Sequence, residues 1–306
     1  MDILCGDVGG TNTRLALWSN GRLLLERHWP SREFGGLEGP VRAWLAATGA
    51  RPDRACFGVA GPVREQRCVT TNLPWIVDGP EMTALLGVPV RIVNDFHAAA
   101  RGVTVLGPDD LAQVGGGDAV PGAPVAVLGA GTGLGEALVV GDEVVPGEGG
   151  HVDFGPADAR ELRLAAWLIA RNGRASWEDV LCGRGLVNLA RFDHVDRGVP
   201  APAWLDEPDA PARVTASEPD VVEWFCALYG AEAGNHALRV LARGGVFLCG
   251  GIAPRLVPAL RASRFRERFE AKGKLGEAIR DIPVYVAMHP ALGLVGAAAE
   301  ALRIRD

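Results

Sequence analysis

A glycine-rich pattern occurs twice in this chain, about 120 residues apart, and it constrains the fold more than any other feature. Residues 8–17 read VGGTNTRLAL and residues 129–138 read GAGTGLGEAL, so a Gly-Thr pair and an Ala-Leu pair align. In both copies an apolar strand candidate precedes the glycines, and a second strand, a tight turn and a third strand follow them. Two such copies predict a duplicated α/β fold.

These two loops interrupt apolar strand sequence with residues suited to binding an anion. They comprise Asp7, Gly9, Gly10, Thr11 and Asn12 in the first loop, and Gly131, Thr132 and Gly133 in the second. Glycines let backbone N–H groups approach an anion closely, and Thr and Asn add side-chain donors. A purely structural alternative is a Gly-Gly bulge followed by a Thr-Asn turn. The shared context favours a pair of loops that hold a polyphosphate.

A third glycine site, in GGVFLCGGIAPRL, follows another apolar strand. Gly250 and Gly251 end that strand, and Pro254 is predicted in the first turn of a helix over residues 254–265. Such a strand-to-helix turn leaves N–H donors pointing outward, which suits the base and ribose of a nucleotide.

Two polar residues end the strand candidate in VRIVNDFHAAARGV. Asn94 and Asp95 are most often a helix cap in such a place, but the carboxyl end of a strand is also where α/β proteins build active sites. In the second interpretation Asp95 accepts a proton from a substrate hydroxyl and Asn94 orients that substrate. We expect the nearby His97 to pack or to contact solvent.

The window VVPGEGGHVDFGP surrounds Glu148 with glycines and continues to His151 and Asp153. Without competing bulk, the Glu and His side chains reach a small polar ligand. A carboxylate that accepts two vicinal hydroxyls, with an imidazole beside it, suits a neutral sugar. A metal site at the three residues is the alternative, but it lacks HExxH or paired-Cys spacing.

In SWEDVLCGRGLVNL, Ser176 is followed by Glu178 and Asp179. A serine cap with acids in the first turn predicts a helix that begins there. This structural interpretation accounts for Asp179.

Composition excludes several classes of protein. At 306 residues, 48% hydrophobic, the chain is too long for one core, so we expect two domains. A net charge of -6 argues against partners such as nucleic acid or an anionic membrane.

Six scattered cysteines without a CxxC pair, and a start without signal-peptide features, indicate a reduced, cytoplasmic protein. The absence of GxxxxGK[ST] excludes a P-loop phosphotransferase.

Taken together, the motifs resemble the bacterial glucokinase family, within the superfamily of sugar kinases, Hsp70 chaperones and actin. They follow in the expected order along nearly the whole chain: GDVGGTNTRLAL, TNLPW, NDFHAAA, GAGTGLG, PGEGGHVDF, CGRGLVNL, GGIAPR and DIPVY. The resemblance implies a two-domain, duplicated actin/hexokinase-like (ribonuclease H-like) fold with a cleft between the domains. It also implies phosphorylation of D-glucose at its 6-hydroxyl by ATP, with Mg²⁺ on the nucleotide, in a homodimer.

The same resemblance assigns roles to individual residues. It makes Asp95 the catalytic base, and it implies sugar ligands at Asn94, Glu148, His151 and Glu178, with Thr71 and Asn72 as further sugar contacts. It implies phosphate loops at residues 7–12 and 129–135, with Thr11 and Thr132 near the phosphates, and an adenosine loop at Gly250 and Gly251. Asp7 would lie near the magnesium, through water.

The chain departs from related groups at two points. The cysteine cluster that holds zinc in the repressor/ORF/kinase group of sugar kinases is missing, so we expect no structural zinc. Residues 181–186 read LCGRGL where the glucokinase family commonly reads LSGPGL, which affects the loop after Glu178 and hence sugar selectivity.

For the domains, we expect a small one at residues 1–104 completed by a helix at 288–306, and a large one at 105–287. The turn-rich stretch at residues 107–124 and the segment DIPVYVAMHP are the candidate boundaries.

Two other functions compete with a glucokinase. One is a kinase of another hexose, such as mannose, fructose or an N-acetylhexosamine, because the same residues bind related polyols. The other is a non-catalytic, nucleotide-dependent sugar sensor on the same fold. A sensor would have no use for a carboxylate at Asp95 beside three further sugar ligands.

Overall fold

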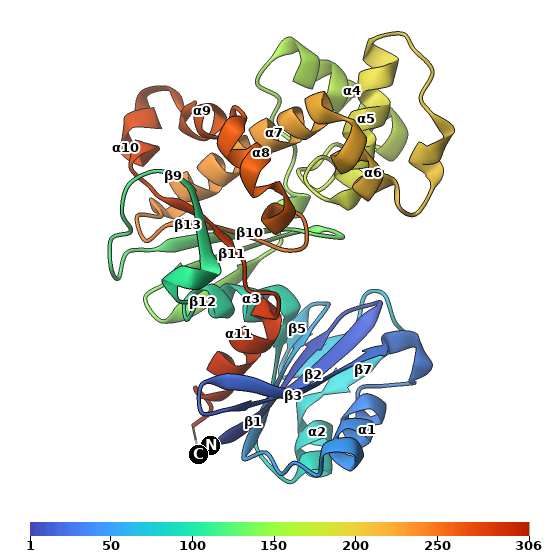
Figure 1. Cartoon of the computed structure of the whole chain (residues 1–306), viewed down its shortest axis with the longest axis vertical. Coiled ribbons are helices and arrows are strands. Elements are labelled where there is room, and N and C mark those ends of the chain that lie inside the picture. The colour runs from blue at the N-terminus through green and yellow to red at the C-terminus, as the bar shows by residue number, and fades with distance from the viewer. Residues whose placement is uncertain (306) are drawn as a thin grey trace. The chain divides into compact units, whose positions relative to one another are not determined.

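The computed structural model describes residues 1–305, which divide into two compact units. Unit 1 comprises residues 1–110 and the chain from His289 onward, and unit 2 comprises residues 111–288. Figure 1 shows each unit with its own sheet and helices.

Unit 1 contains a five-stranded sheet in the order β3-β2-β1-β4-β8. Its strands are β1 (Asp2–Val8), β2 (Asn12–Ser19), β3 (Arg22–Pro30), β4 (Arg54–Val59) and β8 (Val90–Asn94). A small sheet adds β5 (Val63–Arg64), β6 (Arg67–Val69) and β7 (Ile76–Asp78). The helices are α1 (Glu38–Thr48), α2 (Gly79–Leu86), α3 (Asp95–Val103) and α11 (Leu292–Ala301), with 3-10 turns at Ser31–Glu33 and Pro108–Asp110.

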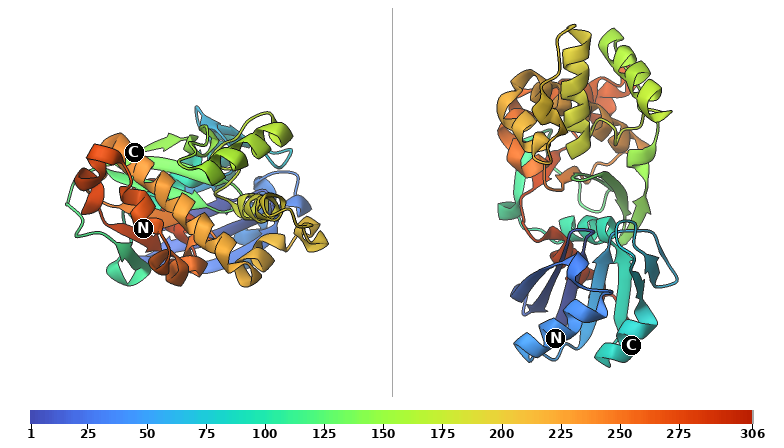
Figure 2. Two further views of the ribbon diagram at one scale, coloured as in Figure 1. Left: turned by 90° about the horizontal axis from the view of Figure 1, so that it is seen from above. Right: turned by 90° about the vertical axis from the view of Figure 1, so that its right-hand side faces the viewer.

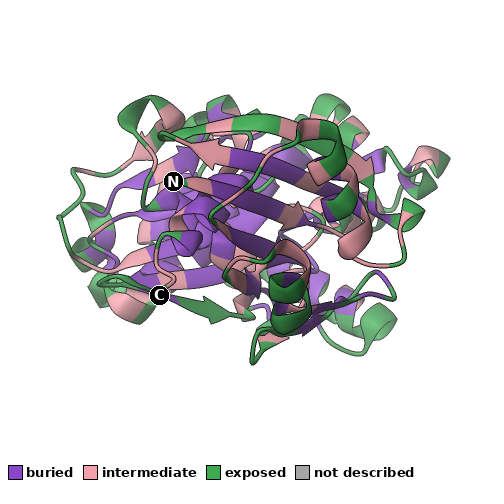
Figure 3. Cartoon of the chain, turned by 90° about the horizontal axis from the view of Figure 1, so that it is seen from below, coloured by how far each residue is buried: buried purple, intermediate pink, exposed green. Residues whose placement is uncertain are grey.

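The sheet of unit 1 is covered on both faces, because its central strands carry apolar residues on both sides. Alternate residues of β1 enter different cores: Leu4 packs with Trp44 of α1 and Met82 of α2, and Ile3 packs with Leu294 of α11. Figure 3 shows burial concentrated in the strands, with exposed residues mainly on loops and outer helix faces.

Unit 2 contains a six-stranded sheet in the order β12-β11-β10-β13-β14-β9. Its strands are β9 (Leu111–Gly115), β10 (Val125–Ala130), β11 (Leu134–Val140), β12 (Glu143–Gly147), β13 (Val246–Cys249) and β14 (Val284–Ala287). The helices are α4 (Ala159–Asn172), α5 (Gly183–Asp196), α6 (Ala210–Ser217), α7 (Pro219–Val240), α8 (Val257–Ala262), α9 (Phe265–Glu270) and α10 (Gly276–Arg280). 3-10 turns occur at Gly149–His151, Ala203–Asp206, Ala253–Leu256 and Gly273–Leu275.

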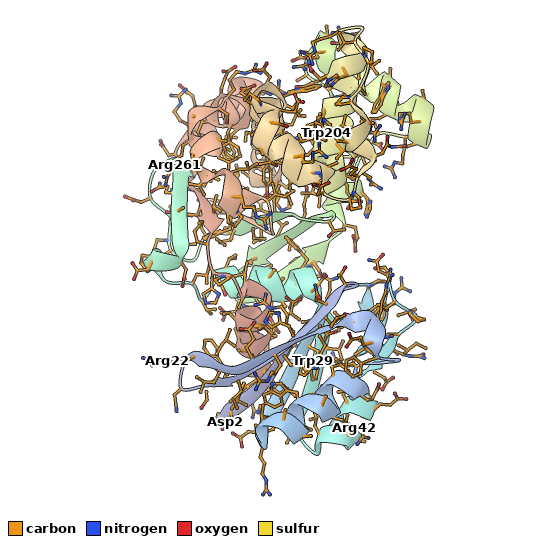
Figure 4. All side chains as sticks on the ribbon, turned by 45° about the vertical axis from the view of Figure 1, so that its right-hand side comes forward. Asp2, Arg22, Trp29, Arg42, Trp204 and Arg261 are labelled. Atoms are coloured by element: carbon orange, nitrogen blue, oxygen red, sulfur yellow. The ribbon has the colours of Figure 1, made fainter. Side chains whose placement is uncertain are left out.

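The long helix α7 organises the core of unit 2, and Figure 2 shows it in orange, crossing the unit. The Tyr229 hydroxyl of α7 accepts a hydrogen bond from Ala130 N at the end of β10 (3.3 Å). At the sheet edge, Arg261 of α8, labelled in Figure 4, donates two hydrogen bonds to the Gln113 carbonyl of β9. Helix and sheet therefore share one core in this unit.

The predicted duplication is confirmed by the order of the strands. In unit 1, β1 pairs antiparallel with β2 and parallel with β4, and in unit 2, β10 pairs antiparallel with β11 and parallel with β13. Each glycine loop is the turn between the first two strands of its copy.

Three local predictions differ from the structure. The helix expected at Ser176 is wrong: Ser176 and Asp179 do form reciprocal cap hydrogen bonds, but only a single turn follows and α5 begins at Gly183. The helix expected over residues 254–265 begins as a 3-10 turn and is interrupted at Ser263. The turn-rich boundary stretch contains the edge strand β9, which pairs with β14.

Two further observations concern the chain as a whole. All six cysteines are free and buried. Among the described residues, no helix has the length and apolar character needed to cross a membrane.

Glu300 fixes α11 to α3 through a buried ionic contact. Arg101 Nε donates to Glu300 Oε1 over 2.6 Å, and His97 Nε2 lies 3.1 Å from the same oxygen. Burial opposes the ionisation of Glu300, but hydrogen bonds from His97 and Arg101 outweigh it and lower the pKa to about 2. The His97 side chain therefore packs against Glu300 of α11, which is one of the two possibilities expected from the sequence.

Replacing Glu300 by Gln is expected to lower the free energy of unfolding by about 3 kcal/mol at pH 7, because the buried Arg101 charge loses this carboxylate. Since the folded pKa lies below the unfolded value of 4.5, the stabilisation is present above pH 4.5 and disappears as the pH falls through about 2. Urea denaturation measures the difference. The control Asp206→Asn breaks an exposed pair with Arg191 and should cost far less. Equal losses in both variants would contradict the role of burial.

Candidate active site

In unit 1 the polar residues singled out in the sequence gather at the carboxyl ends of parallel strands. Strands β1, β4 and β8 are parallel neighbours, so Asp7 near the end of β1 and Asn94 at the end of β8 lie at the same edge of the sheet. Asp95 is the first residue of α3, directly after β8. This edge is where open α/β sheets bind ligands.

Asn94 is a helix cap, as base rates suggest, and its cap interaction leaves part of the amide for a ligand. The side-chain oxygen accepts hydrogen bonds from Phe96 N (2.9 Å) and His97 N (3.1 Å), and Nδ2 donates to the carbonyl of Gly61 (3.1 Å). An amide has two N–H donors, so one remains. The cap and the ligand interpretations of Asn94 are therefore compatible.

Asp7 lies in a mixed electrostatic environment. Burial raises the pKa of its carboxyl, the charge of Arg14 lowers it, and the charge of Asp95 raises it again. Arg14 is itself held by Glu26, with Nη2 to Oε1 at 2.7 Å. Two carboxylates that influence each other in this way form a suitable place for a cation.

The first glycine loop is a tight turn whose shape is fixed by Ser31. Gly9 N donates to the carbonyl of Asn12 (3.0 Å), the Ser31 hydroxyl donates to the carbonyl of Gly9 (2.8 Å), and Ser31 N donates to the carbonyl of Thr11 (2.8 Å). Thr11 and Asn12 are exposed at the tip. The loop thus presents donors from a braced backbone.

Thr71 and Asn72 lie against this loop. A side chain added at Gly10 would come within 2.6 Å of Asn72 Cβ, so glycine permits the close approach. Thr71 N donates to the carbonyl of Ala60, just after β4 (3.4 Å). Both residues are exposed and belong to the same edge of unit 1 as Asp95.

The second glycine loop, in unit 2, joins β10 to β11 and is held by neighbouring backbone. Gly131 N donates to the carbonyl of Gly133 (2.9 Å), and Gly183 N, at the start of α5, donates to the carbonyl of Gly131 (2.9 Å). Thr132 is exposed at the tip. Unlike the first loop, this one depends on a helix start that sequence analysis did not connect with it.

The Gly250 and Gly251 turn lies beside the second glycine loop. Gly251 is followed by Ile252, whose N–H donates to the carbonyl of Ala130, the last residue of β10 (3.2 Å). Both glycines are exposed. The structure therefore brings the turn predicted for adenosine close to the loop predicted for phosphate.

Glu148 and His151 are exposed on the segment after β12. His151 N donates to the carbonyl of Glu148 (3.0 Å), which folds this segment into the 3-10 turn Gly149–His151. Asp153 instead pairs with Arg174 (2.7 Å). Among the described residues, no group of three or more His, Cys, Asp or Glu side chains is arranged to hold a metal ion.

Glu178 connects the segment of Glu148 with the second glycine loop. Its N–H donates to the carbonyl of Gly150 (2.8 Å), and its Oε2 accepts a hydrogen bond from Leu134 N (3.0 Å). Its Oε1 lies 3.3 Å from Arg184 Nη2, and the Arg184 side chain is 62% exposed. Glu178 thus contacts both predicted substrate regions of unit 2, one through its backbone N–H and the other through its carboxylate.

The departure at residues 181–186 has a structural counterpart. The buried Cys182 caps α5: its sulfur accepts a hydrogen bond from Gly185 N (3.3 Å) and its thiol donates to the carbonyl of Glu178 (3.0 Å). Burial raises the pKa of this thiol, which remains a neutral cap. Arg184 adds a charge beside Glu178 that a proline would not supply.

Sequence reasoning missed several residues of these regions. Arg14 and Ser31 act on the first loop, and Gly61 and Arg184 contact Asn94 and Glu178. Arg14 lies two residues after the first loop, and Arg184 lies where residues 181–186 depart from the family pattern, so the sequence offered a reason to consider both. Ser31 and Gly61 had no such signal, because only the folded chain places them beside the first loop and Asn94.

Comparison with known proteins gives consistent matches along the chain. A family model described as Glucokinase matches residues 4–304. The chain is 39% identical over 310 residues to a protein named Glucokinase from Mesorhizobium japonicum, covering 98% of this chain and 91% of the relative. It is 40% identical over 315 residues to another so named from Marinobacter nauticus, covering 98% and 96%. A solved glucokinase structure from an Antarctic psychrotroph has a TM-score of 0.87 and 30% identity, with 99% of both chains covered.

Proposed function

Because the chain belongs to the glucokinase family, we propose that Asp95 is the general base of its reaction. The protein is an ATP-dependent hexose kinase that converts D-glucose and ATP to glucose 6-phosphate and ADP. The observation that carries the role of Asp95 is its place directly after β8, at the sheet edge shared with Asp7 and the first glycine loop.

In this proposal Asp95 accepts the proton of the sugar 6-hydroxyl as that oxygen attacks the γ-phosphorus. A new O–P bond forms, the bond from the γ-phosphorus to the bridging oxygen breaks, and ADP leaves with the electron pair. Asn94 orients the sugar with its remaining amide N–H. No lysine of a P-loop is needed, because catalysis of phosphoryl transfer rests on positioning and on stabilising charge.

Residues of both units serve this reaction. Glu148 and Glu178 accept hydrogen bonds from sugar hydroxyls and His151 adds one polar contact, while Thr71 and Asn72 make further contacts with the sugar. The support for unit 2 is that Glu178 touches the backbone of both the 3-10 turn and the second glycine loop.

The two glycine loops bind the phosphates of ATP, with Thr11 and Thr132 as side-chain donors, and Gly250 and Gly251 contact the adenosine. Mg²⁺, which is proposed here, fits the donor set near Asp7: such an ion is usually held by one or two carboxylates together with phosphates and water. Asp7 would hold it through water. When bound, the ion neutralises charge on the phosphate oxygens.

Oligomeric state and cellular location are proposed from the same resemblance. We propose a cytoplasmic homodimer without a nucleic-acid or membrane partner, and the net charge of -6 supports the absence of such a partner. Light scattering on the purified protein measures the mass, and a monomer at micromolar concentration would contradict the dimer.

A coupled assay of ADP release from Mg·ATP tests the function, with glucose, mannose, fructose, N-acetylglucosamine or no sugar. We expect strong turnover with glucose and weak turnover with the others. Preference for another hexose would keep Asp95 as base and reassign the residues around Glu148. ATP binding without turnover on any sugar would favour the sensor.

A further inference from the structure

Unit 2 contains a buried charged cluster that the reaction itself does not use. Glu136 of β11 is 1% exposed and Glu232 of α7 is fully buried, and both bond to one guanidinium. Arg239 Nη1 donates to Glu136 Oε2 over 2.7 Å and Arg239 Nη2 donates to Glu232 Oε1 over 2.8 Å. Two buried carboxylates therefore share a single positive charge.

The other titratable groups that face Glu136 from α7 are neutral. His236 Nε2 donates to the carbonyl of Ala137 (3.0 Å) and its Nδ1 accepts from Arg239, while burial lowers the pKa of the ring to about 4. Burial raises the pKa of the Tyr229 hydroxyl. The residues that pair with Glu136 across the sheet, Leu128 and Gly147, do not titrate. Among the described residues Arg239 is the cation that hydrogen-bonds to both acids. Lys272, whose pKa burial lowers to about 8, also faces Glu232, but it donates its hydrogen bond to the carbonyl of Ala231.

Protonation of Glu136 balances the charge of the cluster. Burial and the charge of Glu232 raise the pKa of Glu136 to about 7. Glu136 Oε1 is buried and accepts no hydrogen bond from the described residues, but when protonated it can donate to Glu232. In that state the cluster has no net charge and Oε1 has a partner.

Glu136 also touches the segment that carries two proposed sugar ligands. It pairs with Gly147 at the end of β12, and a Cβ at residue 149 would collide with Glu136 Oε2. Only glycine fits over the carboxyl, so the backbone of the 3-10 turn between Glu148 and His151 rests directly on it.

We propose that Glu136 is a positioning residue for sugar binding: its neutral carboxyl supports the backbone at Gly149 and so fixes Glu148 and His151. The proposal rests on the proposed function, in which these two residues bind the sugar. Loss of the proton places two buried negative charges opposite one guanidinium, and their repulsion displaces the carboxyl that lies under Gly149. Sugar binding then weakens as the pH rises.

The test compares glucose KM and kcat from pH 6 to pH 9, at saturating Mg·ATP, in the wild type and in Glu136→Gln. The amide keeps the size of the carboxyl and always has a donor for Glu232. We expect the wild-type KM to rise about fivefold or more across this range, while the variant KM stays flat and kcat matches the wild type at each pH. The control Glu161→Gln changes another buried carboxylate, which bonds to Ala157 N and Arg268, and should keep the wild-type profile.

Thermal unfolding separates the titration from sugar binding. The folded pKa of Glu136 lies above its unfolded value of 4.5, so its stabilisation is present below pH 4.5 and is lost as the pH rises through about 7. Glu136→Gln should therefore gain stability relative to the wild type between pH 5 and pH 8.5. If this variant does not fold, Glu232→Gln removes the same excess charge and should flatten the KM profile as well.

A KM that rises equally in both proteins, or a variant that changes only kcat, would overturn the positioning role. Absence of glucose-dependent ADP release in the wild type at every pH would instead overturn the proposed function, and the positioning role with it. In that case the unfolding measurement still reports whether the cluster titrates.

Discussion

Replacing Asp95 by Asn is expected to lower kcat with glucose by about 10²-fold or more. The amide cannot accept the proton of the 6-hydroxyl, but it has nearly the same size and still suits the first position of α3. Glucose binding is therefore expected to change little. Steady-state kinetics gives kcat, and calorimetric titration with glucose gives the dissociation constant.

Asp78→Asn is the matched control for this variant, because Asp78 caps α2 of the same unit by accepting a hydrogen bond from Glu81 N (3.1 Å). Asn is as good a cap as Asp, so kcat should stay at the wild-type value. Loss of glucose binding in Asp95→Asn with unchanged turnover of the bound sugar would exclude Asp95 as the base.

Glu178→Ala is expected to lower kcat/KM for glucose by about 10²- to 10³-fold, because each lost charge-assisted hydrogen bond contributes about 1.5–3 kcal/mol. One of these bonds is to the sugar and the other is to Leu134 N in the second glycine loop. The KM for ATP should therefore rise together with the KM for glucose. A ligand that touched only the sugar would leave the KM for ATP unchanged.

Arg184→Ala is the control, since it removes the neighbouring charge but leaves Glu178 in place. The Arg184 side chain is 62% exposed, so its pair with Glu178 is screened by solvent. We expect kcat/KM to change by less than about threefold. A loss as large as that of Glu178→Ala would show that Arg184, and not the carboxylate, supplies the binding energy.

The architecture was largely predictable from the sequence, because short-range sequence patterns determine it. Alternation of apolar residues, the two glycine loops and their hairpins sufficed for the duplicated sheets, and Asn94 stands at the end of a strand as expected. The start of α5 was not predictable. A serine followed by acids also describes a single capped turn, and here the chain is held by Trp177 N to the carbonyl of Val152 and by Glu178 N to that of Gly150.

The sequence singles out the candidate site residues one by one, but it does not show which of them are in contact. The sequence marks Glu178 and Leu134 separately, and no pattern joins two residues 44 positions apart. The same holds for Glu136, which meets Arg239 across 103 positions. Such contacts depend on how helices pack on the sheet, and propensity and periodicity carry no information about them.

The route of the chain through unit 1 has a consequence during translation. Strands β1 and β4 emerge early, but one of the two cores that they share is filled by Leu294, Ala297 and Ala298 of α11, near the end of the chain. Unit 2 is continuous in sequence and is inserted between the two segments that form unit 1. One apolar face of the unit 1 sheet therefore stays uncovered until the residues of unit 2 and then α11 have been synthesised.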